Sequence, residues 1–589
     1  MKNLLLLICL LAGFTAHAQW VLPGNMYADS VNAPFYYGVA SGDPLADKVI
    51  IWTHYTPANY NDPAVTLTWE MALDSNFTTL ATSGTVTTDS TTDWTVKVDA
   101  AGLTANTRYY YRFRDGQGNT SLIGRTLTAP VGDVSNLKFA VTSCTSVFSG
   151  YFNGYRRIAE RSDLNLVIHL GDYIYDFIDE AEEVRVPDPY AVKPTNLNEW
   201  RERHRYYMHD PDLRLVRQMH PFMHMWDNHD IAGDRDITTQ AFFEWTPSRV
   251  VNTQDKKRFY RTASYGDLVD IIMLDIMIWR DVDEVSPGEF SVLGTEQQTW
   301  FLDALQQSTA KWKIVGTQKM FSYWGVTGAF PSSFNQGTWD GFTAERELVL
   351  DVIEDNNIEN VIVISGDSHL SVACDLSKDP TNGSVYDGNT GDGGLGVEFC
   401  PTSLTRGNFD ELGLPSALLG ILYDLSYQGN PHLLYNEFTE HGYGVLDIGE
   451  DSTTASIWWS DIFQIANTET LGKQLVVYNG VNHWKRDGQT YNPVSVNEVL
   501  GTNEPLVKLY PNPADNAINI DLTVPGDEVV SISIIEFHSY KRLSHLSTLS
   551  KNVQGQSVIT LPISHLSAGM YLVFMQGDGW VKALPFSKL

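Results

Sequence analysis

Alternating apolar and polar positions predict β-strands in the first quarter of the chain. Apolar residues occupy every second position over 65–71 and again over 109–113. A period of two places successive side chains on opposite faces of a half-buried strand. Gly, Asn and Asp residues separate these runs, as expected for turns. We therefore predict a small antiparallel β-sandwich of immunoglobulin or fibronectin type over 19–130.

After Pro130 the pattern changes to apolar strands that alternate with helices. Continuous apolar runs lie at 137–141, 164–170, 271–274 and 361–364. One helix is predicted to begin at Thr295, where Thr295 and Gln298 match a capping box, and another covers Arg346–Ile353. This alternation predicts an α/β domain over 131–465.

The hydrophobic patterns at both ends of the chain differ from that of the middle. Residues 466–505 are polar and poorly periodic, which predicts an extension or linker, and 506–589 show short alternating segments typical of a small β-sandwich domain. At the start, Lys2 precedes an apolar run over 4–14 and an Ala-His-Ala cleavage pattern at 16–18. We expect 1–18 to be a signal peptide, with no transmembrane segment after it.

Charge and cysteine content narrow the function classes. The chain has 40 Lys and Arg against 71 Asp and Glu, a formal net charge of −31. This balance disfavours a nucleic-acid-binding surface. Removal of the signal peptide leaves Cys144, Cys374 and Cys400. An odd number leaves at least one thiol without an internal disulfide, and the sequence leaves open whether Cys374 and Cys400 pair.

Residue types that bind metals directly follow four predicted strands, at 137–141, 164–170, 221–226 and 361–364. They are Cys144 after the first strand, Asp172 and Tyr175 after the second, Asn228 and His229 after the third, and Asp367 and His369 after the fourth. In open α/β sheets, ligands bind beyond the carboxyl ends of the strands. Carboxylates suit Ca²⁺, Mg²⁺ or Mn²⁺, whereas thiolate and imidazole favour a transition metal. The pattern predicts a mixed polynuclear metal site.

Each of these residues also has an ordinary structural interpretation. A Gly-Asp pair after a strand is usually a turn, and a cysteine at a strand end is more often a buried small hydrophobe than a ligand. His229 is flanked by polar residues and would suit an exposed, paired histidine. The occurrence of ligand types at four strand ends in order is what favours the metal site.

The sequence resembles the PhoD-like phosphatases over about residues 35–465. Gly-Val-Ala-Ser-Gly-Asp-Pro at 38–44 and Val-Ile-Ile-Trp-Thr at 49–53 are similar to the opening of that family, and the strand-end motifs follow in the family's order. The resemblance implies a calcineurin-like metallophosphoesterase sandwich with Fe³⁺ and Ca²⁺. It implies that a metal-bound water, hydroxide or oxide attacks the phosphorus of a phosphate ester.

The resemblance also implies roles for individual residues. Cys144, Asp172 and Tyr175 would bind ferric iron, Asn228, Asp367 and His369 would be further metal ligands, and His229 would contact the scissile phosphate as the catalytic residue. The family commonly has an acidic residue at the position of Asn228. Asn-His-Asp at 228–230 is instead similar to ordinary binuclear metallophosphoesterases, so a dinuclear transition-metal site stays an alternative.

The tail resembles the C-terminal sorting domain of type IX secretion. Tyr-Pro-Asn-Pro at 510–513 and Leu-Ser-Ala-Gly-Met-Tyr-Leu at 566–572 carry that similarity. It implies export by the secretion machinery, to the extracellular space or the outer cell surface. A sugar-binding or adhesion β domain is the alternative for the tail.

Two functions follow from these patterns. The first is a secreted, metal-dependent alkaline phosphatase or phosphodiesterase that hydrolyses phosphate monoesters, diesters or both. The second is an exported adhesion or carbohydrate-binding protein whose metals are structural. Adhesion does not require so many ligand-type residues at strand ends, and this density favours the enzyme.

Overall fold

The computed structural model describes residues 26–177, 184–185, 193–280, 291–325, 338–411, 416–486, 506–536, 545–567, 569–577 and 580–588. The signal peptide predicted at 1–18 lies outside these residues. Within them, no helix has the length and apolar character needed to cross a bilayer.

Two large sheets form the centre of the molecule. The ten-stranded sheet has the order β21 (Lys485–Arg486), β20 (Thr470–Tyr478), β19 (Ser452–Trp459), β18 (Gly442–Gly449), β8 (Asn136–Thr142), β9 (Leu166–His169), β10 (Pro221–His224), β1 (Val39–Gly42), β2 (Lys48–His54) and β5 (Thr95–Ala101). The seven-stranded sheet has the order β11 (Arg261–Tyr265), β12 (Val269–Met273), β13 (Trp312–Thr317), β14 (Val361–Ser365), β16 (Gly396–Cys400), β15 (Ser371–Leu376) and β17 (Leu433–Glu437).

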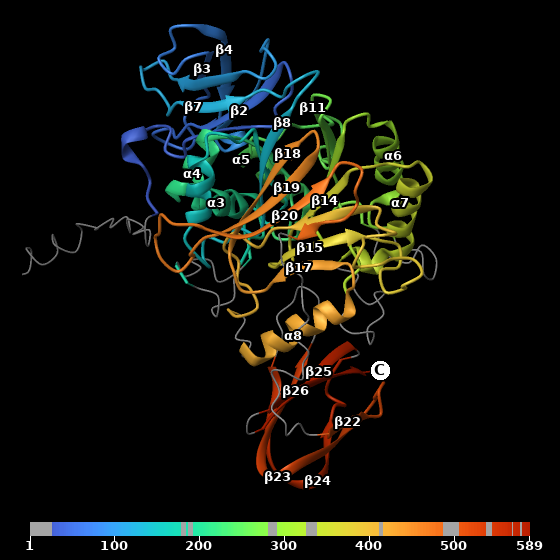
Figure 1. The fold of residues 1–589 in the computed structure, drawn as a ribbon. Helices are drawn as coiled ribbons and strands as arrows, with labels where there is room; N and C mark the ends of the chain where they lie inside the picture. The colour runs from blue at the N-terminus through green and yellow to red at the C-terminus, as the bar shows by residue number, and fades with distance from the viewer. Residues whose placement is uncertain are drawn as a thin grey trace, which may run out of the picture.

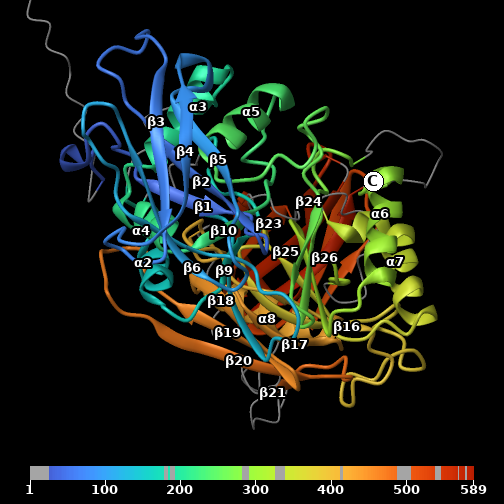
Figure 2. The same ribbon diagram turned by 90° about the horizontal axis from the view of Figure 1, so that it is seen from above.

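Alternation along the strands explains how the layers pack. Phe139 and Ile168 of the first sheet meet Ile314 and Ile364 of the second in one buried cluster between the sheets. The outer face of the first sheet is covered by α2 (Asn153–Glu160), α3 (Leu197–Tyr207), α4 (Pro211–Met219) and α5 (Arg235–Trp245). The outer face of the second is covered by α6 (Gly294–Gln307) and α7 (Thr343–Asp355) (Figures 1 and 2). The protein is thus mostly β-sheet with covering helices.

The α6 helix corrects one local prediction. It begins at Gly294, and the residue before it makes no side-chain cap. Gln298 Nε2 donates to Glu345 Oε1 of α7 at 2.8 Å rather than returning to its own helix start. The capping box predicted at Thr295 is therefore wrong, because α7 packs beside this helix end and takes the glutamine side chain. The α7 helix contains the predicted segment 346–353 and extends it at both ends.

The N-terminal region does not form a self-contained sandwich. A four-stranded sheet, β4 (Leu80–Thr88), β3 (Val65–Ala72), β6 (Arg108–Arg114) and β7 (Gly124–Leu127), packs against β1, β2 and β5. Those three strands belong to the ten-stranded sheet, because β1 pairs in parallel with β10 at Ser41 and Pro221. One layer of the predicted sandwich is therefore continuous with the central sheet.

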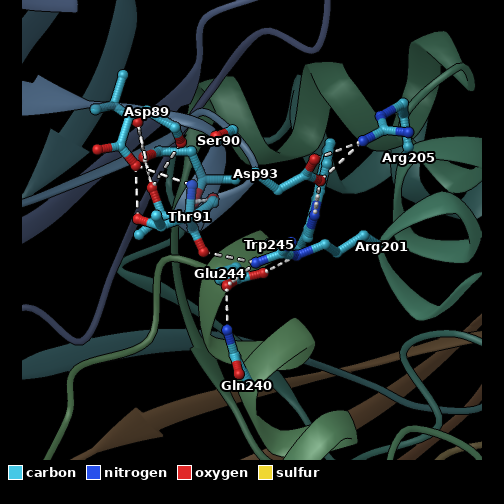
Figure 3. A network of polar contacts seen from close by, with 12 residues as sticks. Asp89, Ser90, Thr91, Asp93, Arg201, Arg205, Gln240, Glu244 and Trp245 are labelled. Atoms are coloured by element: carbon cyan, nitrogen blue, oxygen red, sulfur yellow. Dashed lines mark hydrogen bonds and ion pairs between the residues drawn. The ribbon is translucent and has the colours of Figure 1, made fainter. Parts of the chain in front are cut away.

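A network of ion pairs fixes helices α3 and α5 to the N-terminal strands (Figure 3). Both oxygens of Asp93 accept hydrogen bonds of 2.8 Å from Arg205 Nη2, and Oδ2 also accepts one of 3.0 Å from Trp245 Nε1. Glu244 accepts from Arg201 Nε at 2.7 Å and from Nη2 at 2.6 Å. We call these five residues the junction network.

The segment predicted as a linker is partly wrong. Strands β20 and β21 lie within 466–505 and form the edge of the ten-stranded sheet. Leu475 and Val477 of β20 are buried, and the other residues of this strand are partly or fully exposed. His483 Nδ1 also lies 2.5 Å from Asp375 Oδ2 of β15. The central domain therefore continues to at least Arg486, and 487–505 fall outside the described residues.

The tail forms a five-stranded sheet of β22 (Leu506–Tyr510), β23 (Ala517–Glu536), β24 (His545–Pro562), β25 (Gly569–Gly577) and β26 (Trp580–Lys588). Val573 and Met575 of β25 face the tail's own core. Phe574 faces the other way and is buried in a cluster with Met320 and Leu370. Figure 1 shows the tail next to α8 (Ser416–Gly429), on one side of the central domain.

Candidate metal centre

The predicted ligands converge because their strands are parallel neighbours. β8 pairs in parallel with β9, and β9 with β10, in the first sheet. β13 pairs in parallel with β14 in the second sheet. Loops from the carboxyl ends of both sheets therefore meet at one edge of the central core. These loops supply Cys144, Asp172, Tyr175, Asn228, His229, Asp367 and His369.

Four of these residues have left-handed backbone conformations. Their φ angles are 55° at Cys144, 52° at Asp172, 60° at Asp367 and 55° at His369. A non-glycine residue with this geometry is held at a cost of roughly 1–2 kcal/mol. Such strain commonly gathers at functional sites, where the surrounding fold must fix the direction of a side chain. The turns after β8, β9 and β14 have this property.

Gly171 brings the loops after β9 and β10 into close contact. Its φ is 103°, and a Cβ atom there would lie 2.6 Å from Asp227 Cβ. The expectation that a glycine before Asp172 allows a tight approach therefore has a direct steric basis. Asp230 joins the same loops, because its carboxylate accepts hydrogen bonds from the backbone N–H groups of Ile174 at 3.0 Å and Asp227 at 2.9 Å.

One set of donor groups mixes sulfur, nitrogen and oxygen. Cys144, Asp172 and His369 offer ligand atoms that all lie within 4.8 Å of one another. The Tyr175 hydroxyl donates to Asp172 Oδ2 at 3.0 Å and lies 3.3 Å from His369 Nε2. His369 Nδ1 lies 2.9 Å from the carbonyl oxygen of Gly407, which can only accept. Nδ1 therefore carries the proton, and the lone pair of Nε2 faces the site. We call these four ligand residues the thiolate group.

A second set of donor groups consists of carboxylates. Asp172, Asp227 and Asp367 are buried, and their oxygens also lie within 4.8 Å of one another. Asp172 belongs to both sets, so the two are adjacent. We call this second set the carboxylate group. Among the described residues, Asp367 Oδ2 is a buried acceptor that receives no hydrogen bond.

Lys319 lies inside the carboxylate group. Its ammonium is 3.0 Å from Asp227 Oδ2 and 2.8 Å from Asn228 Oδ1, and it also pairs with Asp367. Burial alone would lower the pKa of Lys319, but the surrounding carboxylates outweigh it and hold that pKa above its ordinary value. The lysine nitrogen is therefore surrounded by oxygen atoms of the carboxylate group and Asn228.

His229 lies on the accessible side of the centre. Its side chain is 20% exposed, and its Nδ1 is 2.5 Å from Oδ1 of the fully buried Asp176. Burial raises the pKa of Asp176, but the hydrogen bond and charge of His229 outweigh it and hold that pKa below its ordinary value. The backbone N–H of His229 also donates to Asp172 Oδ1 at 3.2 Å. Asp176 thus orients the ring and leaves Nε2 directed away from it.

The centre carries more negative potential than its own cations balance. Burial, followed by the charges of Asp172 and Asp367, raises the pKa of the Cys144 thiol well above its ordinary value. Burial, followed by Asp172 and Cys144, does the same to the pKa of the Tyr175 phenol. A bound cation reverses this effect, because it favours the thiolate and the phenolate. The donor set and its charge therefore fit a metal ion.

All seven predicted site residues lie around this centre, but sequence reasoning missed Lys319 and gave Asp227 no role. Lys319 follows β13, and lysine is not a metal-ligand type, so no pattern marked it. Its position could have indicated it, because Lys319 is a polar residue that directly follows a buried strand, as the other site residues do. The metal-binding and catalytic roles of the seven residues stay predictions.

The chain is similar to known proteins. Residues 139–236 and 234–457 match the family described as PhoD-like phosphatase, and residues 22–130 match its N-terminal domain. The chain belongs to the PhoD-like phosphatase family. It is 32% identical to alkaline phosphatase D of Bacillus subtilis (strain 168) over 419 residues, which cover 64% of this chain and 70% of that protein. A solved structure of PhoD superposes with a TM-score of 0.67 and 28% identity, over 78% of this chain and 93% of that one.

The tail of this PhoD-like phosphatase matches a sorting domain. Residues 508–583 match the secretion system C-terminal sorting domain. The type IX resemblance of the sequence is thereby confirmed, and the domain marks the chain for export. The adhesion or sugar-binding alternative for the tail is not supported by this match.

The cysteines are free in the described part of the chain. Cys144, Cys374 and Cys400 are all buried thiols without a disulfide. The Cys400 thiol instead lies 3.1 Å from the Ser368 hydroxyl, next to Asp367. The pairing that the sequence left open between Cys374 and Cys400 is absent here.

Proposed function

We propose that this chain is a secreted, metal-dependent phosphoesterase that hydrolyses phosphate monoesters, diesters or both. The observation that supports it most is the sharing of Asp172 between the thiolate group and the carboxylate group. A shared carboxylate next to a thiol, a phenol and an imidazole makes a compact site for cations. Membership of the PhoD-like phosphatase family agrees with phosphate esters as the substrate class.

The family resemblance implies that Cys144, Asp172 and Tyr175 bind ferric iron, and His369 lies beside them in the thiolate group. Cys144, Tyr175 and His369 supply sulfur, phenol oxygen and imidazole nitrogen, which favour a transition metal over calcium. The carboxylate group and Asn228 supply the hard oxygens that Ca²⁺ prefers, and Lys319 already contacts three of them. When bound, a metal would supply positive charge for the phosphate oxygens and activate the attacking water.

His229 is the proposed catalytic residue. Asp176 accepts the Nδ1 proton, so the ring is held with Nε2 available to a phosphate at the accessible side. A protonated Nε2 would donate to a phosphoryl oxygen as negative charge develops there. Tyr175, whose ring centroid lies 4.3 Å from that of His229, limits the positions that the imidazole can take.

The finer architecture follows the same proposal. The helix–sheet–sheet–helix layering supports a calcineurin-like metallophosphoesterase core. We propose a signal peptide at 1–18, an N-terminal β region at 19–130, a catalytic domain from 131 and a sorting domain at 506–589. The catalytic domain extends to at least Arg486, because β20 and β21 belong to its sheet.

Hydrolysis assays test this function directly. The exported protein should hydrolyse p-nitrophenyl phosphate, bis(p-nitrophenyl) phosphate or both, and should lose that activity on treatment with a chelator. Readdition of iron should restore it, whereas an ester-free control and a heat-treated sample should stay inactive. Inactivity toward both esters in metal-replete protein would favour the adhesion alternative.

A further inference from the structure

A lysine stands where the family resemblance implies a second metal ion. Lys319 follows β13, and its side chain is only 6% exposed. Its ammonium group contacts Asn228 and Asp367, two of the residues that the resemblance implies as further metal ligands, and also contacts Asp227. Oxygen atoms of two predicted metal ligands thus surround a nitrogen.

Strand register places the lysine at this position. Thr317, at the end of β13, lies opposite Ser365, at the end of β14. Lys319 and Asp367 each come two residues later, so the two side chains leave neighbouring strand ends together. The Gln318 side chain between them anchors the turn, because its Nε2 donates to the carbonyl oxygen of Trp226 at 3.0 Å and its Oε1 accepts from the N–H of Ile276 at 3.2 Å. The lysine is therefore held by its backbone as well as by its charge.

An ammonium group and a calcium ion compete for the same oxygens. An ammonium has three N–H donors, which match the three oxygens that Lys319 contacts. Calcium needs about six to eight oxygen ligands at roughly 2.3–2.6 Å, and these oxygens would be its protein ligands here. Two cations among the same buried carboxylates would also repel each other strongly, because the surroundings exclude water. The Lys319 ammonium and a calcium ion therefore cannot occupy this group of oxygens together.

The thiolate group differs on this point. Asp172 Oδ2 accepts a hydrogen bond of 3.0 Å from a neutral donor, the hydroxyl of Tyr175. A metal that displaces this proton gains the phenolate as a ligand. A metal cannot displace a proton in this way at the carboxylate group. There the competing cation is the ammonium of Lys319, which is covalently part of the chain.

We propose that this phosphatase holds one metal ion per chain, in the thiolate group, and that the Lys319 ammonium replaces the second cation. The inference rests on the proposed function, because it concerns the same centre. It departs from the iron–calcium pair that the resemblance implies. The lysine keeps Asn228 and Asp367 fixed in the way that a second metal would. Unlike a metal ion, its positive charge cannot be removed by a chelator.

Metal content and calcium binding test the proposal. The full exported chain would be purified, equilibrated with iron and calcium, and analysed by inductively coupled plasma mass spectrometry and by equilibrium dialysis with calcium. The wild type should contain about one metal ion per chain, and that ion should be a transition metal. Lys319→Met, which shortens the side chain by one atom and removes its charge, should bind a second ion. Its calcium affinity should exceed that of the wild type by about tenfold or more.

Two further variants serve as controls. Lys319→Arg keeps the positive charge and should still bind no calcium. Lys313→Met removes another buried lysine of the same strand, whose Nζ lies 3.4 Å from the carbonyl oxygen of Glu359, and should leave the metal content at the wild-type value. Should Lys319→Met fail to fold, calcium dialysis against the wild type decides the question alone.

The outcomes separate this proposal from the proposed function. A second metal ion in the wild type, or wild-type calcium binding as tight as that of Lys319→Met, would overturn the lysine proposal and leave the metal-dependent enzyme intact. Wild-type protein that takes up no metal at all would contradict both. One transition metal per chain, with calcium binding only after Lys319 is replaced, supports both.

Discussion

Two clusters of buried carboxylates in this protein differ in how their charge is balanced. In the junction network, Asp93 faces Arg205 and Glu244 faces Arg201, so each acid has its own guanidinium (Figure 3). In the metal centre, Asp227 and Asp367 share one ammonium group, that of Lys319, and the third carboxylate of the group, Asp172, lies beside them. The first cluster pairs each acid with its own cation and joins parts of the fold. The second has more carboxylates than it has contacts to an ammonium group, and Asp172 also belongs to the thiolate group.

The comparison shows what buried charge can and cannot indicate. Buried acids alone would mark both clusters as candidate sites. Arginine offers a rigid fork that matches a carboxylate, and pairs of this kind are structural cross-links. The metal centre has in addition a thiol, a phenol and an imidazole on strained turns, which a cross-link does not need. The balance of charge and the types of donor atom therefore distinguish a candidate metal-binding site from a structural ion-pair network.

Removal of the shared carboxylate should have the largest effect. Asp172→Asn takes one ligand from both groups, so metal content should fall below half of the wild-type value. Because a catalytic cation supplies several kcal/mol of transition-state stabilisation, kcat/KM should fall by about 1000-fold or more. Elemental analysis and hydrolysis of p-nitrophenyl esters measure the two effects. Normal metal content in this variant would remove Asp172 from the ligand set.

A residue that acts on the substrate should separate turnover from metal binding. His229→Ala should lower kcat by about 100-fold, the scale of one lost electrostatic contact in a transition state. Its metal content should stay at the wild-type value. The reason is that the imidazole of His229 is hydrogen-bonded to Asp176, which is not a member of the thiolate group. Stopped assays and elemental analysis of the same sample are the measurement. Loss of metal in proportion to activity would make His229 a ligand.

The matching amide substitution in the junction network should have the opposite profile. Glu244→Gln leaves the buried Arg201 without its carboxylate and should lower the free energy of unfolding by about 3 kcal/mol. Metal content and kcat/KM should change by less than about twofold, because charge at the junction is not used in binding or catalysis. Chemical denaturation monitored by tryptophan fluorescence gives the first quantity. A variant that loses metal without losing stability would contradict the distinction between the clusters.

The smallest effect at neutral pH concerns a buried histidine, whose contribution develops only in acid. Burial, followed by the charges of Arg217 and Arg203, lowers the pKa of His204 on α3 to about 3. Because the unfolded state then takes up the proton first, this histidine reduces stability as pH falls below about 6.5, by about 1.4 kcal/mol per pH unit until about pH 3. His204→Phe should flatten the acid limb of the stability profile by that amount. An unchanged slope between pH 6 and 4 would show that the ring is solvated.

The sequence located the strand ends and the polar residues that follow them, for a physical reason. Buried parallel strands are continuous apolar runs, so the polar residue that ends each run is easy to locate, as at Asp172 and Asp367. Parallel pairing then forces those ends together. The left-handed conformation of both residues agrees with the tight turns expected after a Gly.

Other features depend on contacts that no local pattern encodes. Lys319 meets Asp227 only through the order of strands in two sheets, and the ion pair between Arg201 and Glu244 joins separate helices. Strand β20 was missed because its first half, 470–474, is mostly polar and partly exposed, so the apolar positions 475–478 form only a short run. The capping box at Thr295 failed because Glu345 of another helix competes for the same side chain.

Anomalous diffraction from crystals of the wild-type protein tests the central claim most directly. Data collected on both sides of the iron absorption edge should show one peak, between Cys144 Sγ, Asp172 and Tyr175 Oη, and none among the oxygens that contact Lys319. Absence of any peak at the thiolate group in crystals that retain phosphatase activity would contradict the account.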